Sequence, residues 1–374
     1  MTRIQKLSKL NQSIWFDYIE RSLLTRGGLS RLLDQGVTGV TSNPSIFEKA
    51  ITQSEDYDSE IAEMAEKGMS AREIYEALAL GDIAAAADLL RPVYDRTEGR
   101  DGFVSLEVDP AIAFYPEKTV SEAIRLFCRL GRPNVMIKVP ATQAGINAAS
   151  SLIEAGVNVN LTLIFSVVQY VQAAEAYLSG LFRLFVKGPG VPGGLPGNRV
   201  ASVASVFISR TDSLLDPILV EKGRSDLQSR MAISTAKSVY AHFRDLFSGP
   251  SWESFAKRGA RVQRPLWAST STKNPALSDT LYVDRLIGPD TVNTLPPATL
   301  EAFLDHGTVS PALTRGLDEA AQLLAEAAHL GIDLSFAMEK LQQDGLAAFA
   351  RSFSSLLIGI SRKAEALLAE KKCA

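Results

Sequence analysis

Short apolar runs alternate with amphipathic stretches along most of the chain. The runs are apolar at nearly every position, which is typical of strands that are covered on both faces. The stretches between them, such as residues 120–130, 146–155 and 167–182, carry apolar residues at helical spacing. We therefore expect eight strands, each followed by helix, over residues 13–18, 36–43, 102–109, 134–141, 157–165, 200–209, 264–270 and 291–296.

This alternation predicts the α/β class, and the number of strands favours a parallel sheet closed into a (β/α)8 barrel, or TIM barrel. An open doubly wound sheet is the alternative, but it usually needs fewer strands, and no Gly-rich dinucleotide turn follows the first strand. We expect residues 1–374 to form a single barrel domain. Its additions would be a Gly/Pro-rich loop insertion at 187–198 and extra C-terminal helices over 313–374 that close onto the barrel.

Composition places the chain among ordinary globular proteins, with 46% hydrophobic and 22% charged residues in a length of 374. A formal net charge of −3 gives no general attraction to nucleic acid or to anionic membranes. No apolar run reaches the roughly 18 residues of a membrane span, and the N-terminal segment lacks a signal-peptide core. We expect a cytoplasmic protein, a monomer or a homodimer, whose partners are small molecules.

The cysteine content predicts no disulfide framework. The two cysteines are Cys128, in an apolar helical run, and Cys373, near the end of the chain. We expect Cys128 to be a buried structural thiol.

Polar residues at the ends of the apolar strands need an explanation, because the active sites of barrels lie at the carboxyl ends of their strands. Lys138 lies in the run NVMIKVPAT between apolar neighbours. Desolvation there would disfavour the ammonium and leave an amine that can attack a ketone to form a Schiff base. A strand-end lysine whose ammonium reaches water is the alternative, and the residue alone does not decide between them.

Carboxyl and hydroxyl groups on other strand ends suit proton transfer. Asp17, in WFDY, could take a proton from a substrate hydroxyl, unless it only caps the following helix. Glu107, in SLEVD, and Thr162, in NLTL, could hold the water that Schiff-base chemistry expels and later consumes. A buried ion pair between Glu107 and Lys138 is the alternative for that carboxylate.

Further strand-end residues suit recognition of a phosphorylated sugar. The amides of Asn43 and Asn160 can hold hydroxyls, although Asn43 precedes Pro44 and plain turn chemistry also accounts for it. Arg210, which closes the sixth strand in SVFISR, has the forked guanidinium that suits phosphate. Ser269 and Lys273, in WASTSTK, add a hydroxyl and a cation.

Metal and cofactor chemistry has no support in the sequence. His242, His306 and His329 lie in helical or loop contexts away from the strand ends, and none has the spacing of a metal-ligand pair. The chain has no Walker loop and no nucleophile-elbow serine. We expect neither a metal nor a cofactor.

Seven segments in order resemble the transaldolase family. They cover about residues 13–275, and the NTLP segment extends the match to 296. The segments are WFDYIERSLL, GVTGVTSNPSIF, VSLEVDP, NVMIKVPAT, NVNLTLIFS, SVFISR and LWASTSTKNP.

The resemblance implies a transferase of the pentose phosphate pathway that works without a cofactor through a Schiff base on Lys138. The enzyme would move a dihydroxyacetone unit from a ketose phosphate to an aldose phosphate. Sedoheptulose 7-phosphate and fructose 6-phosphate would be donors, and glyceraldehyde 3-phosphate and erythrose 4-phosphate acceptors. Asp17 would be the acid/base that cleaves the C3–C4 bond, and Glu107 and Thr162 would bind the catalytic water.

The resemblance also implies the binding residues. Asn43 and Asn160 would hold the three-carbon unit, while Ser205, Arg210 and Ser269 would form the substrate and phosphate pocket. One departure concerns the phosphate, because many members carry an arginine where this chain has Ser271; the nearby Lys273 is then the candidate replacement. The loop at 187–198 and an insert around 244–263 resemble a longer bacterial subgroup.

Two other functions compete with this reading. A fructose-6-phosphate aldolase-like enzyme would release free dihydroxyacetone, but such relatives are typically shorter and place a tyrosine where Phe207 stands. A barrel that has lost catalysis and only binds sugars would require a broken site, whereas Lys138, Asp17, Glu107 and Thr162 are all present.

Overall fold

The strands form a closed parallel barrel. The computed structural model describes the backbone of residues 1–373 and the side chains of residues 1–371. Within these residues eight parallel strands pair in chain order, and β8 closes onto β1. Each strand overlaps one of the expected segments, which confirms the (β/α)8 barrel. The strands are β1 (Gln12–Phe16), β2 (Gly39–Thr41), β3 (Phe103–Glu107), β4 (Val135–Pro140), β5 (Val159–Ile164), β6 (Ser202–Phe207), β7 (Arg264–Ala268) and β8 (Thr291–Leu295).

Every strand residue is buried, as the two-sided apolar pattern predicts. Register then decides which polar side chains meet. Glu107 pairs with Lys138 across β3 and β4, and Lys138 pairs with Asn160 across β4 and β5. Because paired residues of a parallel sheet point to the same face, these three side chains lie in one row inside the barrel.

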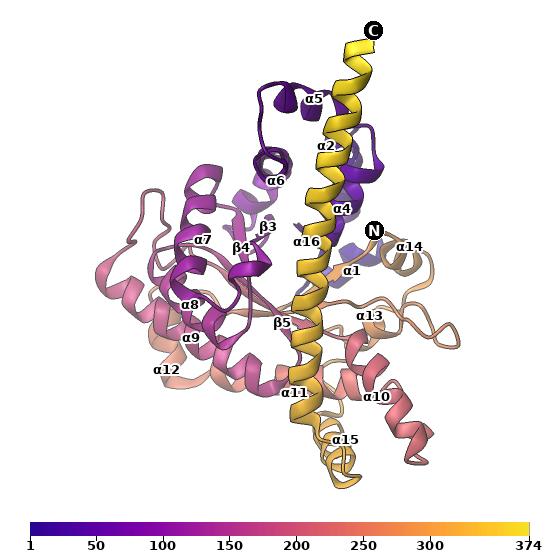
Figure 1. Cartoon of the computed structure of the whole chain (residues 1–374). Coiled ribbons are helices and arrows are strands. Elements are labelled where there is room, and N and C mark those ends of the chain that lie inside the picture. Colours follow the sequence, from indigo (N-terminus) through magenta and orange to yellow (C-terminus); the bar gives the residue numbers. More distant parts are fainter. Residues whose placement is uncertain (374) are drawn as a thin grey trace.

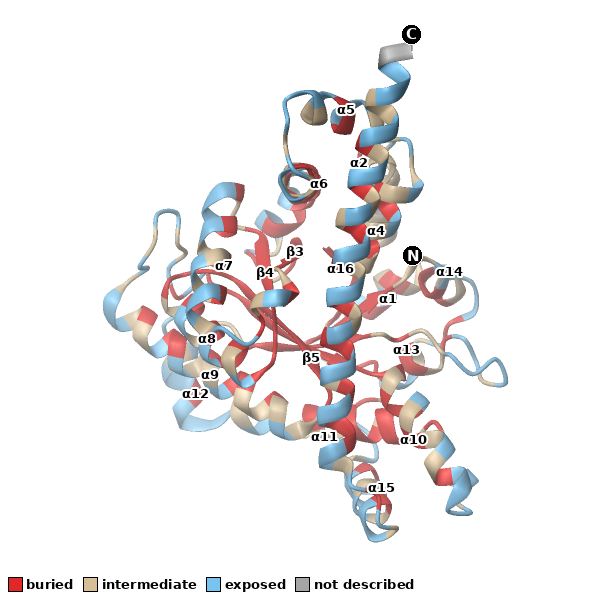
Figure 2. Cartoon of the chain, in the orientation of Figure 1, coloured by how far each residue is buried: buried red, intermediate tan, exposed pale blue. Residues whose placement is uncertain are grey.

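Helices cover the barrel on the outside, and the buried residues concentrate between the strands and the inner helix faces (Figure 2). Those before β6 are α1 (Arg3–Lys9), α2 (Arg21–Thr25), α3 (Gly28–Gln35), α4 (Pro44–Gln53), α5 (Asp58–Glu66), α6 (Ala71–Arg96), η1 (Pro110–Ile112), α7 (Pro116–Leu130), α8 (Gln143–Glu154) and α9 (Val167–Lys187). Those after β6 are α10 (Ser209–Glu221), η2 (Ser225–Leu227), α11 (Met231–Leu246), α12 (Gly249–Ala256), α13 (Leu281–Arg285), α14 (Pro297–His306), α15 (Leu317–His329) and α16 (Leu334–Cys373).

The Gly/Pro-rich segment at 187–198 connects α9 to the start of β6. A helix-to-strand connection in a parallel barrel lies at the amino ends of the strands. The segment is therefore at the opposite end of the barrel from Lys138. It is anchored there by a backbone hydrogen bond from Leu195 to Gly156 (2.8 Å).

The C-terminal helix α16 lies across the carboxyl ends of the strands. Figure 1 shows it as one long yellow helix in front of the strands, running between α15 and α5. The side-chain amide of Gln342 donates to the carbonyl oxygens of Ala141 (2.8 Å) and Leu163 (3.0 Å), at the ends of β4 and β5. Further along, α16 packs on α4, α5 and α6. The extra C-terminal helices of the expected fold are thus confirmed.

Two expectations are corrected. Cys128 is exposed, because the buried positions of α7 include Leu126 and Phe127 and the helical turn places the next residue outside. The side chain of Cys373 lies outside the described residues. Arg210 does not close a strand, since β6 ends at Phe207 and Arg210 is the second residue of α10.

Across the described part of the chain, no helix is both long and apolar enough to cross a membrane.

Candidate active site

A cavity of about 210 Å³ opens at the carboxyl end of the barrel and gathers most of the residues that the sequence singled out. Its walls come from the ends of β1, β2, β4, β6, β7 and β8, from the segments that follow them, and from Phe349 of α16. The expected site residues that line it are Asp17, Asn43, Lys138, Ser205, Arg210, Ser269 and Lys273.

Lys138 lies in the depth of this cavity and is only 5% exposed. Its Nζ donates to the carbonyl oxygen of Ser42 (3.2 Å) and lies 3.4 Å from Oε2 of Glu107. The amine therefore does not reach bulk water, which removes the alternative of a strand-end lysine at the surface.

Glu107 is buried beside Lys138, and burial raises the pKa of its carboxyl to about 6. The cationic Lys138 opposes this rise and the charge of Asp17 adds to it. Apart from the approach of Lys138, neither carboxylate oxygen has a hydrogen-bond partner among the described residues, and the same holds for Oγ1 of Thr162, which is fully buried. Buried polar atoms normally have partners, so this pair has unused capacity to bind and exchange protons.

Asp17 follows β1 directly and faces Lys138 across the cavity floor. Burial raises the pKa of Asp17, while Lys138 and a hydrogen bond from Thr41 oppose the rise. The Thr41 hydroxyl donates to Oδ1 of Asp17 (2.6 Å) and lies 2.6 Å from the hydroxyl of Thr294. Because a hydroxyl has one hydrogen, Thr294 must donate to Thr41. Asp17 does not cap α2, whose N-cap residue is Glu20.

Thr41 and Thr294 were missed in the sequence, although both line the cavity. Each occupies the last or next-to-last position of a strand, β2 or β8, where an apolar residue would be expected. A polar residue at such a strand end was the sequence signal that could have identified both threonines as site residues.

The two asparagines have different surroundings. Asn43 caps α4 by accepting from the backbone N–H of Ile46 (3.0 Å), so turn chemistry uses its oxygen. Asn160 is fully buried beneath the cavity lining. It donates to Oγ of Ser105 (3.1 Å) and accepts from Oγ of Ser205 (2.6 Å), and Ser205 connects it to the cavity.

The cations lie farther from Lys138, towards the outer part of the cavity. The Arg210 guanidinium stands 5.5 Å from the centre of the Phe207 ring and has no ion-pair partner within 4 Å among the described residues. Burial lowers the pKa of Arg210, and Asp344 opposes this. Lys273 is exposed on the loop after β7 and donates to Oγ of Ser271 (3.0 Å).

Ser269 follows β7 directly, in the left-handed region with φ of 55°. Its Oγ lies 3.0 Å from Oγ of Ser209 in the first turn of α10. The two chain segments that carry the serines therefore meet on one side of the cavity.

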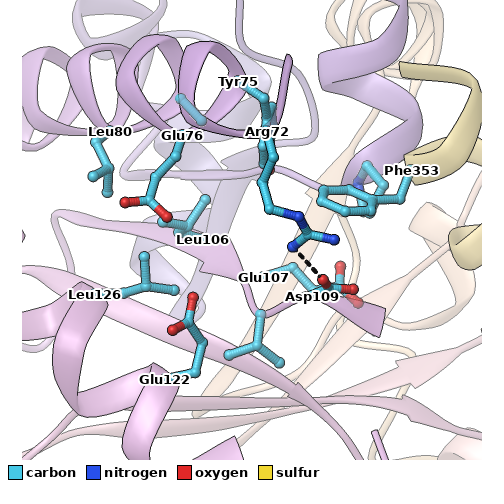
Figure 3. A pocket seen from close by; sticks show the side chains of 13 residues that line it. Arg72, Tyr75, Glu76, Leu80, Leu106, Glu107, Asp109, Glu122, Leu126 and Phe353 are labelled. Atoms are coloured by element: carbon cyan, nitrogen blue, oxygen red, sulfur yellow. Dashed lines mark hydrogen bonds and ion pairs between the residues drawn. The ribbon is translucent and has the colours of Figure 1, made fainter. Parts of the chain in front are cut away.

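A second, smaller cavity of about 40 Å³ lies between β3, α6 and α16 (Figure 3). Arg72 crosses it and pairs with Asp109 (2.5 Å), and Phe353 and Tyr75 close one side with rings in edge contact. Glu107 borders this cavity, while its carboxylate approaches Lys138, which lines the larger one. No sequence pattern predicted this arrangement.

Among the described residues, no group of three or more His, Cys, Asp or Glu side chains is placed to hold a metal ion. The chemistry that this part of the barrel supports is that of a buried amine close to the Glu107 carboxyl, in a cavity that Asp17, Arg210 and Lys273 also line.

Comparison with known proteins gives consistent matches over nearly the whole chain. The family model described as Transaldolase/Fructose-6-phosphate aldolase matches residues 14–360. A relative from Neisseria meningitidis named Transaldolase is 44% identical over 96% of this chain and 99% of its own length. Transaldolase 2 of a Nostoc species is 40% identical over 98% and 99%, and Transaldolase 1 of Streptomyces avermitilis is 42% identical over 96% and 94%.

Proposed function

The chain belongs to the transaldolase/fructose-6-phosphate aldolase family, and from this premise we propose that Lys138 is the Schiff-base lysine of a transaldolase. The enzyme is a transferase that moves a dihydroxyacetone unit between sugar phosphates of the pentose phosphate pathway. The observation that carries the assignment is the buried Lys138 amine, which lies 3.4 Å from the Glu107 carboxylate and lines one cavity with Asp17.

In the first step the Lys138 amine adds to the ketone carbon of fructose 6-phosphate or sedoheptulose 7-phosphate. The carbinolamine then loses water as the imine forms. Glu107 and Thr162 handle this water: the Glu107 carboxylate lies 3.4 Å from Lys138, and a carboxyl of pKa about 6 can give and take protons near neutral pH. The buried Thr162 hydroxyl, on the neighbouring strand, is likewise without a partner among the described residues.

Carbon–carbon cleavage follows. Asp17 takes the proton of the C4 hydroxyl, the C3–C4 bond breaks, and the electron pair passes into the imine to give an enamine on Lys138. The aldose phosphate leaves, and an acceptor such as glyceraldehyde 3-phosphate or erythrose 4-phosphate enters. The same steps in reverse order then build the new ketose phosphate, with Asp17 returning its proton to the new hydroxyl.

Binding is divided between the inner and outer parts of the cavity. Asn43 and Ser205 hold the three-carbon unit beside Lys138, and Asn160 contributes by orienting Ser205. The phosphate lies farther out.

Arg210, Ser269 and Lys273 bind this phosphate, with Lys273 in the part of the missing arginine at Ser271. Arg210 makes no ion pair within 4 Å among the described residues, which leaves its guanidinium available to a dianion even though Asp344 acts on it from farther away.

We place the protein in the cytoplasm. The exposed free thiol of Cys128 supports a reducing compartment.

Borohydride trapping tests the central assignment. Incubation with fructose 6-phosphate and borohydride, followed by mass spectrometry, should fix a three-carbon adduct on the peptide that carries Lys138. Lys138→Ala should show no adduct, whereas the matched control Lys118→Ala, on the outer helix α7, should be labelled like the wild type. An unlabelled wild type that still binds the sugar phosphate would refute the Schiff-base mechanism.

A further inference from the structure

One aromatic ring of α16 covers the amine of Lys138. Phe349 is 4% exposed, lines the same cavity as Lys138 and Asp17, and has its ring centre 5.8 Å from Nζ of Lys138. It comes from a helix that is far from the catalytic strands in sequence but lies across their carboxyl ends (Figure 1).

Contacts on both sides of Phe349 hold α16 in this position. Gln342 bonds to the ends of β4 and β5, and the hydroxyl of Ser352 lies 2.8 Å from that of Ser45 in α4. Between them Gly345 lies against Leu163, where a Cβ would stand 2.8 Å from Cδ2 of that leucine. The ring is thus fixed by the helix and does not depend on a mobile loop.

Leu163 lies where the backbone of β5 is irregular, and this irregularity places it in contact with α16. The pairing of β5 with β6 shifts register between Leu161 and Ile164, and Leu163 has a φ of 60°, which non-glycine residues rarely adopt. Its carbonyl oxygen accepts from Gln342 and its side chain meets Gly345. A strained strand end next to Thr162 is therefore used to hold the helix that carries Phe349.

Water next to the enamine on Lys138 would divert the reaction from transfer to the release of free dihydroxyacetone. After the aldose phosphate leaves, the enamine on Lys138 waits for an acceptor. If a water molecule protonates the enamine carbon, a protonated imine and hydroxide result; the hydroxide then adds to the imine carbon, and the carbinolamine breaks its bond to Lys138 and releases dihydroxyacetone. The balance is enamine plus one water giving free amine plus dihydroxyacetone, and no oxidant or reductant is needed.

We propose that Phe349 excludes water from the enamine carbon and thereby sets the ratio of transfer to release of free dihydroxyacetone. The inference rests on the proposed role of Lys138. An apolar ring offers water no hydrogen-bond partner, so filling this part of the cavity favours the waiting intermediate over its hydrolysis. Phe349 is in this sense a specificity-determining residue.

The test compares Phe349→Ala, Phe349→Leu and wild type in the full-length protein. With fructose 6-phosphate and erythrose 4-phosphate present, free dihydroxyacetone is measured with a coupled dehydrogenase and sedoheptulose 7-phosphate by chromatography. We expect the ratio of release to transfer to rise on the order of tenfold in Phe349→Ala. Phe349→Leu should give an intermediate ratio, because it restores much of the lost apolar volume.

The matched control is Phe353→Ala, one turn farther along α16. Phe353 is also buried, but it packs on Tyr75 and Arg72 in the smaller cavity (Figure 3). It should leave the ratio near that of wild type even if it destabilises the helix. An equal rise in Phe353→Ala would refute the shielding role and assign the effect to a loosened helix. An unchanged ratio in both Phe349 variants would refute it as well.

Borohydride trapping in the same samples distinguishes a failure of the proposed role of Phe349 from a failure of the Schiff-base assignment to Lys138. An adduct on Lys138 together with an unchanged ratio would overturn only the role of Phe349. Absence of an adduct in the wild type would overturn the Schiff-base assignment itself, and this inference with it.

Discussion

The hydroxyl of Thr41 should control the protonation of Asp17, and Thr41→Val tests this with almost no change in shape. Thr41 donates a 2.6 Å hydrogen bond to the carboxylate, and this bond lowers the pKa of Asp17 against the rise that burial causes. A hydrogen bond to a charged group contributes about 1.5–3 kcal/mol. The variant loses that stabilisation of the charged form, so the pKa of Asp17 rises further.

The consequence for activity follows from the direction of proton transfer. Asp17 must be charged to accept the proton of the C4 hydroxyl, so activity falls as the pH drops through its pKa. In Thr41→Val this acid limb moves to higher pH, and at an acidic pH on the limb kcat/KM should fall by roughly tenfold or more, because about 1.4 kcal/mol corresponds to a factor of ten. At high pH, where both proteins carry the charged carboxylate, the difference should shrink.

The assay is the pH dependence of kcat/KM for cleavage of fructose 6-phosphate, with Thr294→Val as the matched control. Thr294 bonds to Thr41 and not to Asp17, so its removal should move the acid limb less. Thr41→Val also leaves the Thr294 hydroxyl without its acceptor, at a cost of about 1–3 kcal/mol in the free energy of unfolding. An acid limb that stays in place while kcat/KM falls equally at all pH values would refute the role of Thr41, because only geometry would then have changed.

Four further results are expected. Glu107→Gln should lower kcat by about 10²–10⁴-fold, since the proton carrier for imine formation is lost; a smaller loss would point to a structural carboxyl. Because the pKa of Glu107 is raised from 4.5 to about 6 on folding, this carboxyl takes about 2 kcal/mol of stability from the native state as pH rises through that window. Urea titrations at pH 4 and 7 should therefore show a loss about 2 kcal/mol larger in wild type than in Glu107→Gln, since other buried carboxyls of raised pKa, such as Asp212, titrate in both proteins. Arg210→Ala and Lys273→Ala should raise KM for fructose 6-phosphate by about 10–100-fold and leave kcat/KM for unphosphorylated fructose nearly unchanged, because each removes a charge-assisted phosphate contact; equal losses on both sugars would contradict a phosphate role. Gln342→Ala should lower the free energy of unfolding by about 1–3 kcal/mol, measured by urea titration, because it removes two hydrogen bonds that hold α16.

The sequence was sufficient for the barrel and for most of its polar strand ends. Two-sided apolar runs occur only where both faces of a strand are covered, and eight of them separated by helices leave few other arrangements. In a closed parallel barrel the carboxyl ends of all strands converge, so the presence of Asp17 and Lys138 in one cavity follows from their position at strand ends. Their chemical roles, and those of the other site residues, stay predictions.

Where the sequence was insufficient, the missing information concerned orientation. Arg210 was expected in a strand, because an apolar run gives its composition but not the residue at which the backbone turns into a helix. Cys128 was expected to be buried, because a one-residue shift around a helix moves a side chain from the inner face to the outer one. The hydroxyls of Thr41 and Thr294 are connected to Asp17 only in the tertiary structure, where Thr41 donates to Asp17 and Thr294 lies 2.6 Å from Thr41.

By itself, the sequence determined the barrel and the strands on which Lys138 and Glu107 lie, because the apolar pattern of each strand is a local property. Their burial and their pairing in register depend on contacts between strands, which only the tertiary structure shows. Only the tertiary structure decided what covers them. The amphipathic pattern of residues 334–373 shows that a helix has a buried face, but not against which surface that face packs. Contacts such as those of Gln342 with the strand ends join segments far apart in sequence, and they alone place Phe349 over Lys138.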